Sequence, residues 1–463
     1  MNISRNPHRA PGRRAQSISI PGWFALILLL GSGSVPAALA QMTPAAETPV
    51  LKEGMYVGPV SCAASGCHGS PAPVEGAKVL MNEYDTWLHA PSPTHVHAWE
   101  VLLQPLSRRI AKNLGLEQPP EKSSVCIACH SMNVPQNLQA TTGALEIADG
   151  VSCEGCHGPA GGWLAGHTSD GWSHADSVAK GMTDLKDLPT RARTCLGCHM
   201  GNDSREVNHD MIASGHPILN FELDNFSGSP LMPNHWKPDP ARDGVPAWAV
   251  GQVVAQREEA ANLVRHANGP QWPEFTHMSC ASCHHPLREG EWRQERGYRY
   301  RPGMPLRSQA RWLVLRHIVE TAAPQESAPL TEEMAQLSDA VGRMKDRARI
   351  AELAGAVEGR LDRVLPAVQA KNWTDADVRK MVGLIAGDAD RYEIADRQSA
   401  EQATLALISL VSQLDRSSRG SMSGTVDQLY QLLQRLRYPD EYDRKEFAST
   451  LRTLLKPSTA PVG

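Results

Sequence analysis

Large aromatic side chains are scarce in this chain, which has only 5 phenylalanines among 463 residues and an aromatic content of 5%. A polypeptide of this length can form two or three domains, each with its own hydrophobic core. Because so few bulky side chains are available for those cores, we expect another large apolar body to fill part of the interior.

Long apolar runs are absent after residue 30, so no later segment is expected to span a bilayer. The early run Trp23–Leu30 ends ten residues before Ala40, in the small-x-small sequence Ala38-Leu-Ala40. It is preceded by basic residues without any acidic one, namely Arg5, Arg9, Arg13 and Arg14. This order predicts a signal peptide over residues 1–40 and export to the periplasm or another exported bacterial compartment. The run is too short to favour an uncleaved membrane anchor.

Positive charge does not predominate, which argues against a nucleic-acid partner. The whole chain has 46 basic and 50 acidic residues. Removal of a signal peptide with four arginines leaves 42 against 50, a net charge near −8. We therefore expect redox partner proteins with a basic docking face rather than nucleic acid.

No cysteine is left over for a disulfide, although exported proteins commonly contain them. All 10 cysteines fall in motifs that end in Cys-His, and four of the motifs are Cys-x-x-Cys-His. This motif is the attachment signature of a c-type haem, in which both thiols bond to the porphyrin and the histidine binds the iron. Zinc and iron–sulfur sites also use paired cysteines, but they need no histidine after every second cysteine. The sequence therefore predicts five c-type haems as cofactors, and the porphyrins would supply the missing apolar bodies.

The expected haem-binding cysteines are Cys62, Cys67, Cys126, Cys129, Cys153, Cys156, Cys195, Cys198, Cys280 and Cys283. The expected proximal iron ligands are His68, His130, His157, His199 and His284. The first motif has four residues between its cysteines, and Gly66 offers the unusual backbone angles that the extra residues require. A disulfide or a metal loop is the alternative for this motif, but the four regular motifs downstream favour haem.

The second axial position of each iron decides what the haem can do. A second histidine suits electron transfer, whereas an empty position can bind a small molecule. The remaining histidines outnumber the irons, so counting them leaves open whether an accessible iron exists. His97, Glu100 and Asp149 lie near the motifs and are candidates for proton transfer at such an iron. For His89, His97 and His174, a surface or hydrogen-bonding role is the simpler interpretation.

Residues 56–220 resemble the tetrahaem cytochrome c-554 family, the electron acceptors of hydroxylamine oxidoreductase. The resemblance is carried by Glu83-Tyr-x-x-Trp87, by His95-Val-His-Ala-Trp-Glu-Val-Leu102, and by Cys153-Glu-Gly-Cys-His-Gly-Pro159 with the later Gly166-His167. The order of the first four motifs also agrees. The chain resembles an extended pentahaem relative, because it adds a fifth haem and a helical C-terminal region to this pattern.

The resemblance implies a set of distal ligands. It assigns His167 to the haem of His68, His95 to the haem of His199 and His216 to the haem of His157, and it leaves the haem of His130 without a protein ligand. Three further histidines are candidates both for that open position and for the haem of His284, namely His209, His235 and His277.

The fold is expected to be mainly α, with little regular sheet. We predict a signal peptide over 1–40, a pentahaem cytochrome c domain over 41–305, a bundle of five or six helices over 306–456 and a tail over 457–463. Within the bundle, Pro366 is expected to end or kink a helix near Leu365, and Ser399-Ala-Glu-Gln402 is expected to cap another. The bundle has no chemistry of its own and is a candidate for covering the haems or for self-association.

Three functions are compatible with these features. The first is electron transfer between redox partners through five haems, in which the protein supplies spacing, ligands and electrostatics. The alternative is an oxidoreductase of a nitrogen oxide, hydroxylamine or a sulfur compound at one open haem. The third is a scaffold in which the bundle directs assembly. We favour electron transfer.

Overall fold

The computed structural model describes residues 51–92, 94–141, 144–233, 239–285, 303–390, 394–418, 423–434 and 441–455. These residues form the helices α1 to α16 and several short 3-10 helices, and within them β-structure is limited to isolated bridges such as Tyr56–Gln139. The expected mainly α fold is confirmed. In the same described ranges, none of the helices has both the length and the apolar character needed to cross a membrane.

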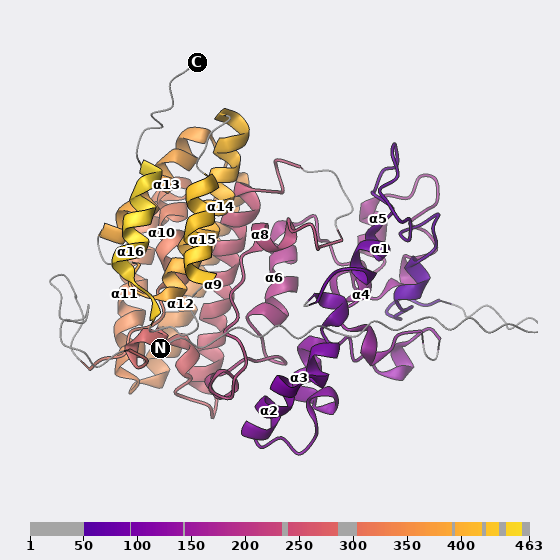
Figure 1. Ribbon diagram of the computed structural model, residues 1–463, viewed down its shortest axis with the longest axis horizontal. Helices are drawn as coiled ribbons and strands as arrows, with labels where there is room; N and C mark the ends of the chain where they lie inside the picture. The colour runs from indigo at the N-terminus through magenta and orange to yellow at the C-terminus, as the bar shows by residue number, and fades with distance from the viewer. Residues whose placement is uncertain are drawn as a thin grey trace, which may run out of the picture. The chain divides into compact units, whose positions relative to one another are not determined.

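The helices of the first part of the chain are short and are separated by turns (Figure 1). Frequent glycine and proline residues interrupt the helical hydrogen-bond ladder here, so few helices exceed two turns. The helices are α1 (Glu83–Leu88), α2 (Pro105–Asn113), α3 (Ser124–His130), α4 (Cys153–His157), α5 (His174–Ala179), α6 (Leu188–His199), α7 (His209–Ala213) and α8 (Leu223–Ser227).

The later helices are mostly longer and pack against one another (Figure 1). They are α9 (Val245–Asn268), α10 (Ala310–Ala322), α11 (Pro324–Arg343), α12 (Arg347–Ala370), α13 (Asp375–Asp390), α14 (Arg397–Ser418), α15 (Ser423–Gln434) and α16 (Arg444–Leu451). Their apolar residues recur at helical spacing and form buried faces, as Val357, Leu361 and Val364 do on α12.

One hydrophobic core joins α6 and α9 to the C-terminal helices. α9 packs along α12, and Trp248 on α9 is completely buried, as is Leu361 on α12. This core crosses residue 306, where the sequence predicts a domain boundary, and that boundary stays a prediction.

Two expectations about the ends of the C-terminal helices are wrong. Pro366 does not end α12, which continues to Ala370, and a kink at this residue stays a prediction. The buried residues Leu365 and Val368 on either side of it contribute packing energy that opposes the cost of the missing hydrogen bond. Helix α14 begins at Arg397 because the carboxylate of Asp396 accepts the N–H of Ser399 at 2.8 Å, so Ser399 lies within the helix rather than at its cap.

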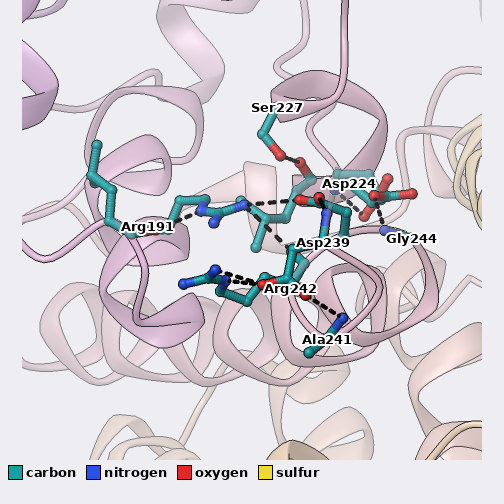
Figure 2. Close-up of polar contacts among 11 residues, drawn as sticks. Arg191, Asp224, Ser227, Asp239, Ala241, Arg242 and Gly244 are labelled. Atoms are coloured by element: carbon teal, nitrogen blue, oxygen red, sulfur yellow. Dashed lines mark hydrogen bonds and ion pairs between the residues drawn. The ribbon is translucent and has the colours of Figure 1, made fainter. Parts of the chain in front are cut away.

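A polar network positions α6 next to α8 and α9 (Figure 2). Arg191 on α6 is 7% exposed, and its guanidinium donates to the carbonyl of Leu185 at 2.7 Å and to that of Arg242 at 3.5 Å. Asp224 on α8 accepts the N–H of Gly244, where α9 begins, at 2.6 Å, and the hydroxyl of Ser409 on α14 at 2.7 Å. Because α6 ends in the fourth Cys-x-x-Cys-His motif, this network also places that motif.

Candidate metal centres

Three of the regular motifs lie at helix C-termini. The histidines His130, His157 and His199 are the last residues of α3, α4 and α6. Residues three and four positions apart share one face of a helix, so the two thiols and the imidazole project to the same side. This local geometry is what covalent attachment of a porphyrin and ligation of its iron require.

The widened first motif closes into a compact loop after the 3-10 helix Pro59–Cys62. The N–H of His68 donates to the carbonyl of Cys62 at 3.2 Å, as the N–H of His284 does to that of Cys280 at 2.8 Å in the fifth motif. Gly66 does not adopt a left-handed φ, so the role expected for it is wrong. The required glycine is Gly69, where a Cβ would lie 1.9 Å from the carbonyl oxygen of Ala63.

Among the described residues, four motif histidines face a second histidine from a distant part of the chain. The distances between ring centres and the angles between ring planes are 6.3 Å and 10° for His68–His167, 6.1 Å and 78° for His95–His199, 6.4 Å and 83° for His130–His216, and 6.5 Å and 32° for His209–His284.

These separations are those of two imidazoles on opposite sides of one metal ion. An imidazole nitrogen binds a metal at about 2 Å and the ring centre lies roughly 1 Å behind it, so two opposed ligands have centres roughly 6 Å apart. Directly packed aromatic rings cover a similar range, about 4.5–7 Å. The hydrogen-bonded rings of His266 and His277, however, are closer, at 5.0 Å.

The hydrogen bonds of four of the facing histidines support metal ligation. In each bond Nδ1–H donates to an oxygen, which fixes the tautomer whose Nε2 lone pair can bind iron. The bonds run from His68 to Glu83 at 2.7 Å, from His130 to the carbonyl of Ala98 at 2.7 Å, from His167 to that of Leu164 at 2.5 Å and from His216 to that of Pro217 at 2.8 Å.

Three histidines outside these pairs use Nε2 for hydrogen bonds to carboxylates instead. The Nε2 atoms of His174, His266 and His317 bond to the carboxylates of Asp184, Glu206 and Asp388, respectively. His97 uses both nitrogens, for Glu100 at 2.7 Å and for the carbonyl of Ala90 at 2.9 Å. His89 is 69% exposed and pairs with Asp85. Asp149, the other candidate for proton transfer, accepts the N–H of Glu146 in a helix cap.

His216 faces His130, whereas the resemblance implies that it ligates the haem of His157. The side of His130 that was expected to be open therefore faces an imidazole, and the assignment of His216 to one iron or the other stays a prediction. The placement follows from contacts between α2 and the turn that follows α7. Asn113 at the end of α2 donates to the carbonyl of Ser214 at 3.2 Å, and Gly215 then turns the chain with a φ of 116°.

The three remaining candidates for distal ligands differ in their positions. His209 faces His284 from the start of α7, where Asn208 caps the helix by accepting the N–H of Met211. His277 is buried and hydrogen-bonded to His266. His235 lies outside the described residues, and its ligand role stays a prediction.

Two glutamates act in this region without having been predicted. Glu83, 4% exposed, bonds to His68, and this bond is the main reason why the pKa of His68 is raised. Glu154, 3% exposed, sits inside the third motif and accepts the backbone N–H groups of Val57 at 3.0 Å, Gly58 at 2.9 Å and Ala160 at 2.8 Å. In the sequence, Glu154 could have been recognised as a carboxylate that lies between two haem-binding cysteines and must therefore point into the protein.

A cavity of about 890 Å³ surrounds the fifth motif. Its wall includes Cys280, Cys283, His284 and the facing His209, and α14 contributes Gln398, Glu401 and Gln402. The volume falls within the range of about 300–1,000 Å³ that is usual for small-molecule and cofactor sites. Two thiols, two opposed imidazoles and this volume fit a covalently bound haem.

The attachment cysteines of different motifs lie next to one another. A hydrogen bond with Cys153 raises the pKa of the Cys62 thiol, and a hydrogen bond with Cys129 lowers that of Cys198 to about 7. Burial, with the charges of Cys195 and Cys198 nearby, raises the pKa of Cys156 to about 12. The first motif therefore adjoins the third, the second adjoins the fourth, and the third adjoins the fourth.

A comparison with known protein families finds a match for part of the chain. Residues 60–158, which contain the first two motifs and end just after the third, match the sequence model of the family described as cytochrome c554 and c-prime. No curated protein and no solved structure matches the chain significantly. Over this segment the chain is similar to that family, and the match supports a c-type cytochrome that binds haem covalently and functions in electron transfer.

Proposed function

We propose that this protein is an exported multihaem c-type cytochrome that carries five haems and passes electrons between redox partner proteins. The observation that carries the proposal is the set of four facing histidine pairs, with ring centres 6.1 to 6.5 Å apart. Two histidines on one iron suit electron transfer rather than substrate binding.

The proposed proximal ligands are the five motif histidines, and the proposed distal ligands come from the facing pairs. His167, His95, His216 and His209 serve the irons of His68, His199, His130 and His284, respectively. We propose His235 for the iron of His157 by elimination, although the sequence offered it for the irons of His130 and His284. When bound, haem supplies one-electron chemistry, and the chain supplies ligands, spacing and electrostatics.

The contacts between motifs support an electron path through the whole set. The first and third motifs share the contact Cys62–Cys153, and the second and fourth share Cys129–Cys198. His199 of the fourth motif also lines the cavity of the fifth. We therefore propose that the fourth site is the junction at which the paths from the second, third and fifth sites meet.

The oxidoreductase alternative placed an accessible iron at His130. Because the imidazole of His216 stands on the distal side of His130, this geometry favours electron transfer over small-molecule reduction there. The contribution of α14 to the fifth cavity supports a covering role for the C-terminal helices. Self-association through these helices is a separate proposal, which sedimentation of the purified protein at several concentrations tests.

The partner proposal rests on charge. A mature chain with a net charge near −8 would dock a partner through a basic face, and such docking weakens as salt screens the charges. Export rests on the predicted signal peptide, and the N-terminal sequence of the protein purified from the periplasm tests it, with Gln41 expected first.

The haem count is tested by intact mass after expression with haem-attachment machinery. We expect five covalently bound haems, and four in a variant with Cys62→Ser and Cys67→Ser. Four haems in the unaltered protein, unchanged by that double substitution, would show that the widened motif does not bind haem.

A further inference from the structure

A row of three side chains connects the wall of the fifth cavity to the surface. His266 on α9 and His277 are 5% and 6% exposed, and His266 Nδ1 lies 2.7 Å from His277 Nε2. The Nε2 atom of His266 forms a hydrogen bond to the carboxylate of Glu206. All three residues line the cavity that contains Cys280, Cys283 and His284.

The hydrogen bonds of this row allow it to hold one added proton. An ionised carboxylate only accepts, so His266 Nε2–H donates to Glu206. With His266 neutral, its Nδ1 accepts from His277 Nε2–H. A proton arriving from solvent then binds a lone pair of the Glu206 carboxylate, and the bonds from His277 to His266 and from His266 to Glu206 keep their directions. Uptake therefore needs neither a change of tautomer at His277 nor movement of the backbone.

The two ends of the row differ in exposure. The side chain of Glu206 is 24% exposed and adjoins Arg265, whose Nη1 lies 3.9 Å from it. Arg265 also lies 3.6 Å from Asp203, which is 96% exposed. The outer end is therefore in reach of solvent protons, while His277 at the inner end is buried beside the cavity.

Other charges face the row from the elements packed around it. Arg307 is 1% exposed and pairs with Glu259 of α9 at 2.7 Å. Arg311 of α10 lines the same cavity, and Glu274 lies three residues before His277 and accepts the N–H of His209. Burial, and then the charges of His266, Arg307 and Arg265, lower the pKa of His277 to about 3. A further positive charge in this cavity is therefore unfavourable, and removal of one makes a proton on the row more favourable.

We propose that the row Glu206–His266–His277 takes up one proton from solvent when the haem at Cys280 and Cys283 gains one electron. This rests on the proposed fifth haem. The electron comes from the neighbouring fourth site and reduces ferric iron to ferrous iron, which removes one positive charge. The proton enters at Glu206 and stays on the row, and both steps reverse on oxidation. The row therefore binds a proton and does not ligate the iron.

The test is a potentiometric titration of the holoprotein followed by electron paramagnetic resonance, from about pH 5 to 9. The signal of the fifth haem is the one lost in a Cys280→Ser, Cys283→Ser variant. Full coupling makes the reduction constant fall tenfold per pH unit, or about 59 mV for one electron. We expect this slope in part of the range in the unaltered protein, and a flattened slope in Glu206→Gln, His266→Gln and His277→Gln.

His317→Gln is the matched control. His317 is another buried histidine bonded to a carboxylate, Asp388 at 2.7 Å, but it lies on α10 and does not line the cavity. This variant should keep the slope. A flat potential in the unaltered protein, or a slope retained in His266→Gln, would overturn the proposal.

A direct measurement of proton uptake keeps the proposal testable if one of the substituted variants folds poorly. On full reduction in weak buffer, the unaltered protein should take up about one proton more than the Cys280→Ser, Cys283→Ser variant. An equal uptake refutes the proposal. The haem count, taken before any titration, separates this result from a failure of the five-haem proposal. Four haems with none at Cys280 and Cys283 would remove both.

Discussion

Replacement of His216 by alanine should open one iron position and no other. The ring of His216 lies 6.4 Å from that of His130, the distance expected for two ligands of one metal. Alanine removes the whole imidazole but keeps a side chain compatible with the turn that follows α7. The position opposite His130 then becomes accessible, and the other facing pairs keep their ligands.

The expected magnitude is one site per chain. The ferric variant should gain one high-spin signal, and the reduced variant should bind about one carbon monoxide more than the unaltered protein. Both are measured in the same sample, by electron paramagnetic resonance and by carbon monoxide titration. The matched control is His89→Ala, because the side chain of His89 is 69% exposed and pairs only locally with Asp85. This control should change neither signal.

A second variant assigns the new site. Addition of Cys126→Ser and Cys129→Ser, which removes the attachment point beside His130, should abolish the extra carbon monoxide. If the unaltered protein already binds carbon monoxide at the haem of His130, and His216→Ala adds none, the facing pair is not a ligand pair. The open position implied by the family resemblance would then be correct.

Four further outcomes follow from the described contacts. Glu83→Gln removes the carboxylate that bonds to His68, so the imidazole of His68 becomes a less basic ligand. The reduction potential of the haem of His68 should then rise in a redox titration, and the control Glu100→Gln should leave that potential unchanged. Glu154→Ala leaves three buried backbone N–H groups without their acceptor, which should lower the free energy of unfolding by roughly 3–6 kcal/mol and lower the unfolding midpoint. Glu117→Ala, at an exposed position, should have little effect. Because burial raises the pKa of Glu154, the folded state holds that proton more tightly than the unfolded chain does. Its contribution to stability is therefore present below the unfolded pKa and is lost as the pH rises through the folded pKa, a dependence that Glu154→Gln removes from the unfolding midpoints. A fragment of residues 306–456 should be helical by circular dichroism. It should be less stable than a fragment of residues 245–456, because α12 loses its contact with α9. Equal stability of the two fragments would show that the shared core is unimportant.

Local chemistry explains what could be predicted from the sequence. Attachment of a porphyrin needs two thiols and an imidazole within a few residues, so the motifs themselves identify the cysteines and the proximal histidines. Helical periodicity likewise predicts the C-terminal helices, as in the buried spacing of Leu361, Val364 and Val368 on α12. Helix ends were less predictable, because Asp396 competes with Ser399 for the cap and packing opposes the effect of Pro366.

The distal ligands depend on contacts between segments far apart in the chain, which the sequence by itself does not reveal. His216 faces His130 because the turn after α7 is bonded to the end of α2, and the residues around His216 in the sequence do not reveal that contact. The same holds for the wall that α14 contributes to the fifth cavity and for the row from Glu206 to His277. The residue types that can bind iron are thus determined by the sequence, whereas the choice among chemically identical histidines is made by tertiary packing.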